Sequence, residues 1–197
     1  MTTLSFACKC GTLSGVLRDV SPKVGSRVMC YCKDCQAGAR ALGADFALND
    51  RGGTEIFQTV PSHIDITQGQ DHLACLRLSP NGLMRWYAAC CDTPMFNTLA
   101  TPKLVFSGVA TANLRGDLND LGPVIAVNKG ECATPGAEIK NYGYLRAGWN
   151  IMKRNLAAKL RGDCKTPFFD DTGGPVVTPR VLSLEERKAA TLDHLTG

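Results

Sequence analysis

Short runs of alternating or β-branched residues dominate the first 110 positions of the chain. Pro, Gly and Asn residues separate these runs, which occupy residues 54–60, 64–67, 73–78, 83–87 and 103–107. Alternation with a period of two places every second side chain on one face of a strand, so each run predicts a short strand. Residues 79–82 (Ser-Pro-Asn-Gly) predict a hairpin turn between two of them. Residues 33–42 are the one segment of this half that suits a helix.

The pattern changes after residue 110, where Gly and Pro interrupt a weakly periodic stretch up to residue 139. Apolar residues then recur at the spacing of one helical face, at Leu145, Trp149, Met152, Leu156 and Leu160. Gly162 is a suitable C-cap for this helix. Ser183 and Glu186 form a capping-box pattern that predicts a second, short helix. We expect the first helix to dock on the β part and to leave a cationic face in solvent.

These patterns predict a mainly β fold with a C-terminal α-helical extension. They divide the chain into a β domain of residues 1–110 and a partly helical extension of residues 111–197, packed on the first. The 197 residues are 44% hydrophobic and 20% charged, which is typical of a globular chain and excludes a wholly disordered one.

No secretory signal is recognisable at the N-terminus, and the longest apolar stretch, residues 124–127, is far shorter than the ~20 residues that span a bilayer. No transmembrane segment is therefore expected, and we expect a cytoplasmic protein. Its cysteines are then interpreted as reduced thiols or metal ligands.

The net charge of +4 has a local origin, because the segment from Lys140 to Lys165 contains seven basic residues and one acidic residue, Asp163. One interpretation is a solvated cationic helix face, and the other is a contact surface for an anionic partner. Interleaved aromatic residues, which would stack on single-stranded bases, are absent from this segment. Nucleic acid is not expected as a partner.

Cysteine is the unusual residue in the composition. Of the ten cysteines, seven fall in three tight groups, namely Cys8 and Cys10, then Cys30, Cys32 and Cys35, then Cys90 and Cys91. Cysteines one to three residues apart in turns place their thiolates on one side of a loop, as a tetrahedral zinc ion requires. Buried structural thiols and a disulfide framework are the alternatives. The clustering favours one or two zinc ions per chain.

Three motifs carry a resemblance to a known family. They are Cys-x-Cys-Gly at residues 8–11, Cys-x-Cys-x-x-Cys at residues 30–35, and Arg-Trp-Tyr-Ala-Ala-Cys-Cys-Asp-Thr-Pro at residues 85–94. In this order the chain resembles the glutathione-dependent formaldehyde-activating enzyme family, which includes centromere protein V, over roughly residues 4–110. The resemblance implies a β-tent-like fold with two zinc sites. It also implies a carbon–sulfur lyase that acts on a glutathione-type adduct of a small aldehyde.

The resemblance implies that Cys8 and Cys10 form half of a structural zinc site. The family completes that site with Cys-x-x-Cys-Gly, but here Ala88 occupies the first cysteine position and Asp92 the glycine position, while Cys91 matches the second cysteine. Cys90 is the candidate for the fourth thiolate. A three-ligand site completed by another group and a degraded site are the alternatives to a site formed by Cys8, Cys10, Cys90 and Cys91.

The resemblance further implies that Cys30, Cys32 and Cys35 hold a second zinc ion with an open fourth position. Such a zinc ion is a Lewis acid that lowers the pKa of a bound thiol or water. Tyr31 stands where the family often has His, which removes one candidate acid/base group. A closed site, an empty site and redox-active thiols are the alternatives.

Two functions follow from these features. One is a zinc-dependent enzyme whose substrate contains a small thiol such as glutathione; its acid/base residue is not identified. The other is a non-catalytic, zinc-stabilised scaffold that contacts an anionic partner through the basic helix. Gln36 and Arg40 are interpreted as a solvated helix face, and His63 and His72 as solvated turn residues.

Overall fold

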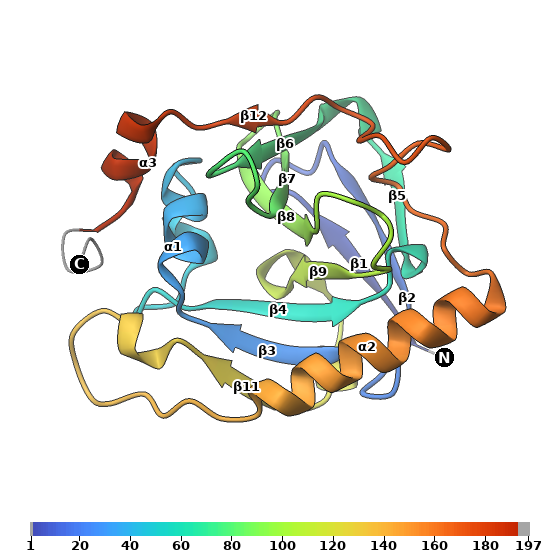
Figure 1. Cartoon of the computed structure of the whole chain (residues 1–197), viewed down its shortest axis with the longest axis horizontal. Coiled ribbons are helices and arrows are strands. Elements are labelled where there is room, and N and C mark those ends of the chain that lie inside the picture. Colours follow the sequence, from blue (N-terminus) through green and yellow to red (C-terminus); the bar gives the residue numbers. More distant parts are fainter. Residues whose placement is uncertain (1, 193–197) are drawn as a thin grey trace.

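Two β-sheets form the framework of the protein in the computed structural model, which describes residues 2–192 (Figure 1). The smaller sheet contains, in spatial order, β10 (Leu114–Arg115), β1 (Thr2–Ala7), β2 (Ser14–Val20) and β5 (Ile64–Gln68). The larger sheet contains, in spatial order, β11 (Val124–Asn128), β3 (Ser26–Cys30), β4 (Thr54–Thr59), β9 (Ser107–Ala110), β8 (Thr93–Thr98), β7 (Met84–Ala88), β6 (Leu73–Arg77) and β12 (Arg180–Val181).

Neighbouring strands are antiparallel, except that β11 runs parallel to β3 and β12 runs parallel to β6. Within the described residues the α-helices are α1 (Lys33–Arg40), α2 (Tyr144–Arg161) and α3 (Leu184–Ala190). Ser183 caps α3 and Glu186 completes the capping box, as predicted. The predicted fold class, mainly β with a C-terminal helix, is confirmed.

Most of the individually predicted strands are present. The runs at residues 54–60, 64–67, 73–78 and 83–87 correspond to β4, β5, β6 and β7. The predicted hairpin joins β6 and β7, with the Gly82 N–H donating to the Ser79 carbonyl at 3.0 Å. The fifth strand begins only at Ser107, because the Val105 N–H donates to the Asn155 side chain of α2, at 2.8 Å, rather than to a neighbouring strand.

One hydrophobic cluster joins the two sheets. Leu4, Phe6 and Leu17 of the smaller sheet belong to the same buried cluster as Phe57, Trp86, Met95 and Phe96 of the larger sheet. The segment after α2 adds Phe168, whose ring lies 5.0 Å from that of Trp86 and 5.3 Å from that of Phe96. The C-terminal part thus supplies core side chains, and the division of the chain at residue 110 stays a prediction.

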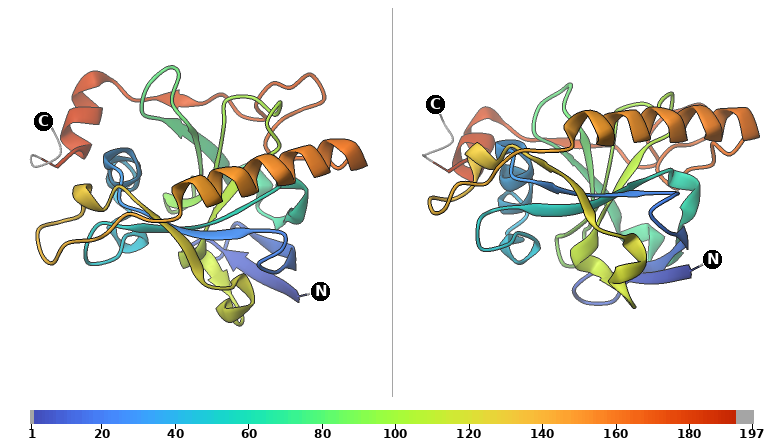
Figure 2. Two further views of the ribbon diagram at one scale, coloured as in Figure 1. Left: turned by 60° about the horizontal axis from the view of Figure 1, so that its bottom comes forward. Right: turned by 90° about the horizontal axis from the view of Figure 1, so that it is seen from below.

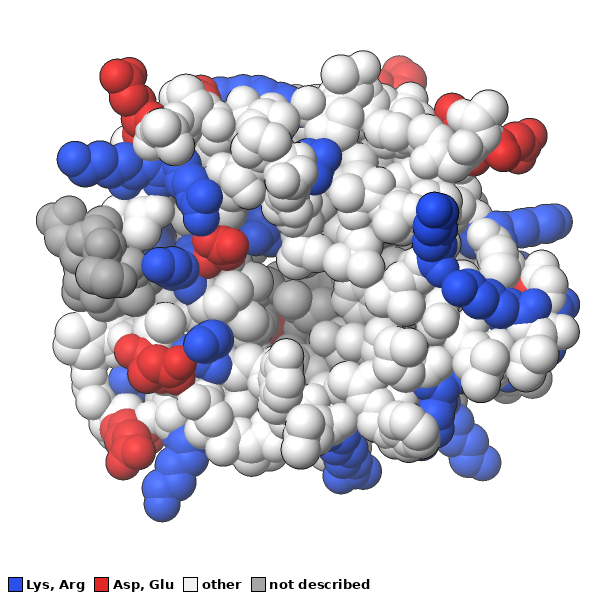
Figure 3. Space-filling view, in the orientation of Figure 1, with Lys and Arg blue, Asp and Glu red and all other residues white. Residues whose placement is uncertain are grey.

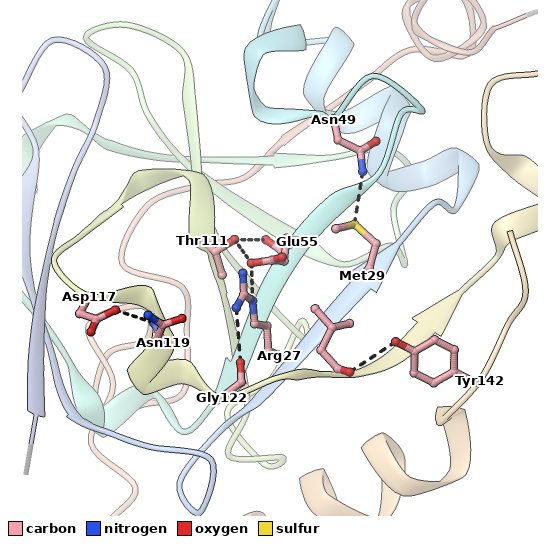
Figure 4. A network of polar contacts seen from close by, with 10 residues as sticks. Arg27, Met29, Asn49, Glu55, Thr111, Asp117, Asn119, Gly122 and Tyr142 are labelled. Atoms are coloured by element: carbon pink, nitrogen blue, oxygen red, sulfur yellow. Dashed lines mark hydrogen bonds and ion pairs between the residues drawn. The ribbon is translucent and has the colours of Figure 1, made fainter. Parts of the chain in front are cut away.

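A polar network fastens β3 to its neighbours (Figure 4). Arg27 of β3 pairs with Glu55 of β4 at 2.7 Å, and the Thr111 hydroxyl donates to the same carboxylate oxygen at 2.8 Å. Arg27 also donates to the Gly122 carbonyl at 3.4 Å, just before β11. These bonds fix β3 between β4 and β11, and β3 ends at one of the clustered cysteines.

Helix α2 has nearly the predicted bounds, and Gly162 at φ 69° is its C-cap. Its orientation differs from the prediction. The apolar stripe faces solvent, with exposed fractions of 84% for Leu145, 65% for Trp149, 51% for Met152, 58% for Leu156 and 80% for Leu160. The expectation that this stripe docks on the β part was therefore wrong.

The opposite face of α2 contacts the sheet, across β11, β3 and β4 (Figure 2). Ala147 packs with Val28 and Ala126, and Ala158 packs with Val60 and Val105. Small side chains let the helix approach the strands closely. Asn155 and Arg154, which donates to the Ser26 hydroxyl at 3.0 Å, add polar anchors. Small and polar residues, rather than large apolar ones, therefore fix the helix.

The orientation of α2 predicts an unusual order of mutational effects. Asn155→Ala will lower the free energy of unfolding by about 1–3 kcal/mol, because the buried Val105 N–H loses its acceptor. Leu156→Ala removes more apolar surface but from a solvent-facing position, so we expect a change of less than about 0.5 kcal/mol. Denaturant unfolding of both variants measures the difference. A larger loss for Leu156→Ala would contradict this orientation.

Candidate metal centres

Four cysteines meet where the turn between β1 and β2 lies against the turn between β7 and β8. All four sulfurs of this four-cysteine group lie within 4.8 Å of one another, and four of the six Sγ–Sγ distances are 3.6 Å for Cys8–Cys10, 3.7 Å for Cys8–Cys90, 3.4 Å for Cys10–Cys90 and 3.9 Å for Cys90–Cys91. Because β1 belongs to the smaller sheet and β7 and β8 to the larger sheet, the group links the two sheets.

Backbone hydrogen bonds shape the two turns. The Leu13 N–H donates to the Cys8 sulfur at 3.3 Å, and the Lys9 N–H donates to the Thr93 hydroxyl at 3.1 Å. Gly11 at φ 81° and Asp92 at φ 52° adopt left-handed conformations, which Gly tolerates best and Asp better than most other residues. These turns orient the four sulfur atoms toward one another.

The sulfur distances fit a tetrahedral metal ion. Four sulfur ligands at about 2.3 Å from a zinc ion lie about 3.8 Å from one another. The observed distances of 3.4–3.9 Å are close to this value, whereas a disulfide would require about 2.0 Å. Hydrogen bonding to Thr12 lowers the pKa of Cys10 to about 6, so this thiolate forms readily near neutral pH. The four-cysteine group could hold a metal ion.

A second, three-cysteine group lies at the corner between β3 and α1. Cys30 is the last residue of β3, Cys32 is the N-cap of α1, and Cys35 lies in the first turn of that helix. The Sγ–Sγ distances are 3.1 Å for Cys32–Cys35 and 3.8 Å for Cys35–Cys30, and all three sulfurs lie within 4.8 Å of one another. The strand-to-helix corner thus gathers three candidate ligands from six residues.

Electrostatics favour a thiolate in the three-cysteine group. Hydrogen bonding with Cys30 and Cys35 holds the pKa of Cys32 well below its usual range, and the charge of Arg85 lowers it further. The Cys35 N–H at the start of α1 also donates to the Cys32 sulfur, at 3.3 Å. Helix N-termini and nearby cations stabilise thiolates in general.

Arg85 of β7 is buried, with 9% of its surface exposed, and its Nε has no hydrogen-bond partner. Within the described residues no carboxylate forms an ion pair with it. A buried, unpaired cation is costly unless another negative group compensates it. Thiolates of the three-cysteine group are such negative groups.

A small cavity adjoins this group. It has a volume of about 40 Å³, enough for a few heavy atoms. Its lining includes Cys35, Gly38, Leu42, Arg85, Met95 and Asn97. The cavity therefore places a cysteine, a cation and an amide around a space that suits a small ligand group.

Gln36 is buried next to the three-cysteine group and hydrogen-bonds to the backbone around it. Its Nε2 donates to the Tyr31 carbonyl at 2.9 Å and to the Cys132 carbonyl at 2.8 Å, while its Oε1 accepts from Arg40 at 3.3 Å. Gln36 is fully buried. The interpretation of Gln36 as part of a solvated helix face was therefore wrong, because the loop at Cys132 covers this face of α1.

The other residues considered in the sequence lie outside both groups. His63 is half-buried and its pKa is lowered by desolvation, and His72 is partly exposed beside Asp71. Burial raises the pKa of Cys75, a core residue, to about 12. Tyr31 is buried, and its hydroxyl accepts from Asn49 at 3.3 Å.

Arg85 is the residue that sequence reasoning did not single out for a role. Arg85 stands between Met84 and Trp86 in a predicted strand, and this regular alternation predicts that its side chain is exposed. It is buried because both faces of this strand are covered, which the sequence does not reveal.

The fold and these two groups define a mainly β protein with two cysteine clusters that could each hold zinc or another metal ion. The chain belongs to a family described as a family of unknown function (DUF6151), whose model matches residues 1–130. No curated protein matches the chain. A Rhodobacter sphaeroides protein of known crystal structure is similar, with 19% identity and a TM-score of 0.41, over 64% of this chain and 99% of that one.

We predict two zinc ions per chain in protein purified without a chelator, measured by elemental analysis. Cys32→Ser and Cys10→Ser will each lower the content by one, because each variant removes a ligand from a different group. Cys164→Ser, which changes an exposed cysteine outside both groups, is the matched control and will keep two. A zinc content that Cys32→Ser leaves unchanged would contradict metal binding by the three-cysteine group.

Arg85→Met is expected to weaken zinc binding at the three-cysteine group by about 10–100-fold, the range found when groups around a metal site are removed. The reason is that three thiolates and a divalent ion leave one negative charge, which Arg85 balances. Competition with a chromophoric chelator measures the two affinities. Arg85→Met should leave the zinc affinity of the four-cysteine group unchanged. The control Arg77→Met, on the neighbouring strand β6, should leave the zinc affinity of both groups unchanged. Equal weakening at both groups in Arg85→Met would indicate a general loss of structure.

Proposed function

We propose that the protein binds two zinc ions, a structural one in the four-cysteine group and a second one in the three-cysteine group. The observation that carries this proposal is the convergence of seven sulfurs from separate segments into two clusters. Thiolate ligands are soft and favour zinc over hard ions such as magnesium or calcium. In this proposal the ligands of the first ion are Cys8, Cys10, Cys90 and Cys91.

The four-cysteine group has the donor set of a closed structural site. Four thiolates fill the tetrahedral positions of a zinc ion, so no position is left for a substrate. The group joins a turn of the smaller sheet to a turn of the larger sheet. Its role in this proposal is to hold the two sheets together.

The three-cysteine group offers a zinc ion only three protein ligands, Cys30, Cys32 and Cys35. A zinc ion bound there would supply Lewis acidity and would lower the pKa of a thiol or hydroxyl at its free position. We propose that the site acts as a carbon–sulfur lyase on a thiol adduct of a small aldehyde. In that reaction the carbon–sulfur bond of the hydroxymethyl adduct breaks, and the hydroxyl proton passes to the sulfur, which yields a free thiol and an aldehyde.

Residues of this chain support the reaction in specific ways. Arg85 balances the negative charge that three thiolates and a divalent ion would leave, so that an anionic adduct, such as one formed by glutathione, is not repelled from the site. The adjoining cavity of about 40 Å³ suits a one-carbon group and excludes bulky aldehydes. Asn97 lines the same cavity and offers an amide donor for a hydroxyl oxygen.

The resemblance of three motifs to the glutathione-dependent formaldehyde-activating enzyme family supports the same proposal. Of the three departures from the family pattern, Ala88 and Asp92 lie beside Cys90 and Cys91 of the four-cysteine group, and Tyr31 lies between Cys30 and Cys32 of the three-cysteine group. Asp92 at φ 52° keeps the conformation that the family's glycine would favour. Cys90 offers its sulfur 3.4 Å from that of Cys10, which compensates for the missing cysteine at position 88.

A second candidate function is a non-catalytic, zinc-stabilised scaffold. The observation that favours it is the exposed surface of α2, which combines apolar and basic side chains. In that function the three-cysteine group is a second structural site, and no thiol substrate is turned over.

Turnover of an aldehyde adduct separates the two candidates. We expect zinc-loaded protein to accelerate the exchange between glutathione plus formaldehyde and their adduct, measured by NMR exchange spectroscopy. Cys32→Ser should remove the acceleration, because the site loses a ligand, whereas Cys164→Ser should retain it. If protein with two zinc ions per chain fails to accelerate the exchange, the lyase proposal is wrong and the scaffold function is favoured.

A further inference from the structure

Helix α2 exposes a continuous apolar stripe. Five large side chains at the spacing of one helical face are each more than half exposed, namely Leu145, Trp149, Met152, Leu156 and Leu160. Large apolar side chains clustered on a surface mark an interaction site more often than singly scattered ones do. Within residues 2–192 no segment covers this stripe.

The stripe is held rigidly in this orientation. Ala147, Asn155 and Ala158, on the opposite face, are buried against the sheet. The side chain of Asn155 accepts from the Val105 N–H at 2.8 Å, and Arg154 donates to the Ser26 hydroxyl at 3.0 Å. Rotating α2 to bury the stripe would break these bonds. The exposed face is therefore a property of the fold.

Basic residues flank the stripe. At 100° per residue, Arg146 and Lys153 lie along one edge of it and Lys159 along the other, and Arg161 follows in the last turn. All four are exposed, and α2 contains no acidic residue. Figure 3 shows Lys and Arg side chains projecting between uncharged ones along the lower right border, where α2 lies in Figure 1. The surface is apolar in the middle and cationic at its margins.

A surface with apolar residues in the middle and basic residues at its margins favours one class of binding partner over the others. A second copy of the chain would bring cations against cations, because α2 has no acidic residue to pair with them, so self-association is disfavoured. Nucleic acid would use the basic residues but would leave the leucines in water. A negatively charged lipid surface satisfies both features, since acyl chains accept the apolar side chains and anionic headgroups attract the basic ones.

We propose that α2 is an interfacial helix that binds the protein to membranes containing anionic lipids. A helix of 18 residues is about 27 Å long and lies parallel to the membrane plane. Trp149, at the middle of the stripe, sits at the headgroup level, where an amphipathic ring is most stable. Binding is peripheral, because no helix among the described residues has the length and apolar composition to cross a membrane.

The two tryptophans make the test direct. Trp86 is fully buried and Trp149 is 65% exposed, so a lipid surface changes the fluorescence of Trp149 and leaves that of Trp86 unchanged. The 197-residue protein is titrated with vesicles of phosphatidylcholine alone and with vesicles that contain 30% phosphatidylserine. We expect a blue shift and co-sedimentation with the anionic vesicles, both weakened by added salt.

Matched variants separate the two parts of the surface. Leu156→Glu should abolish binding, whereas Leu184→Glu, at an even more exposed leucine of α3, should leave it intact. Lys153→Gln should weaken binding about fivefold, as expected for one basic residue near an anionic surface, and Lys188→Gln on α3 should not. The variants replace exposed residues, so circular dichroism should show unchanged folding.

Three outcomes would overturn the proposal. The first is no binding to anionic vesicles by the wild-type protein. The second is a concentration-dependent dimer in sedimentation velocity that Leu156→Glu abolishes, which would identify the stripe as an interface between copies. The third is binding to heparin and vesicles alike that Lys153→Gln weakens and the uncharged change Leu156→Ser does not, which would identify a purely electrostatic surface. The zinc content of each variant is independent of these outcomes.

Discussion

Four sulfur atoms, all within 4.8 Å of one another, join the two sheets at the turns that follow β1 and β7. Thiols at such distances repel one another once they ionise, so the arrangement requires either protonation or a bound cation. A metal ion resolves the conflict and also closes two loops at once. Because β1 and β7 carry Phe6 and Trp86 into the common cluster, the position of these turns determines how the sheets meet.

Local spacing explains what the sequence could predict. The strands β4 to β7 alternate, and the three-cysteine group lies within six consecutive residues, so both are visible in a short window. The pairing of β11 with β3 is not visible in a short window, because these two parallel strands are about 100 residues apart in the sequence. The same holds for Arg85 and Gln36, since nothing nearby in the sequence indicates that α1 and the loop at Cys132 bury them.

The orientation of helix α2 could not be predicted from the periodicity of its sequence. The 3.6-residue pattern predicts a helix and a large apolar face, and both are present, but it does not determine which face meets the sheet. Ala147 and Ala158 allow a close approach to the strands, and Asn155 satisfies the Val105 N–H, which a leucine would leave unpaired. The close approach and the buried acceptor thus fix the inner face of the helix, and the leucines stay available for contact with another surface.

The strand β3 connects the two surfaces on which function is proposed. Its first residue, Ser26, accepts hydrogen bonds from Asn150 and Arg154 of α2, and its last residue, Cys30, belongs to the three-cysteine group. A five-residue strand separates its ends by about 13 Å, and the Arg27–Glu55 pair holds this strand to β4. If α2 lies on a lipid surface, the cysteine group is therefore held at a fixed, short distance from that surface.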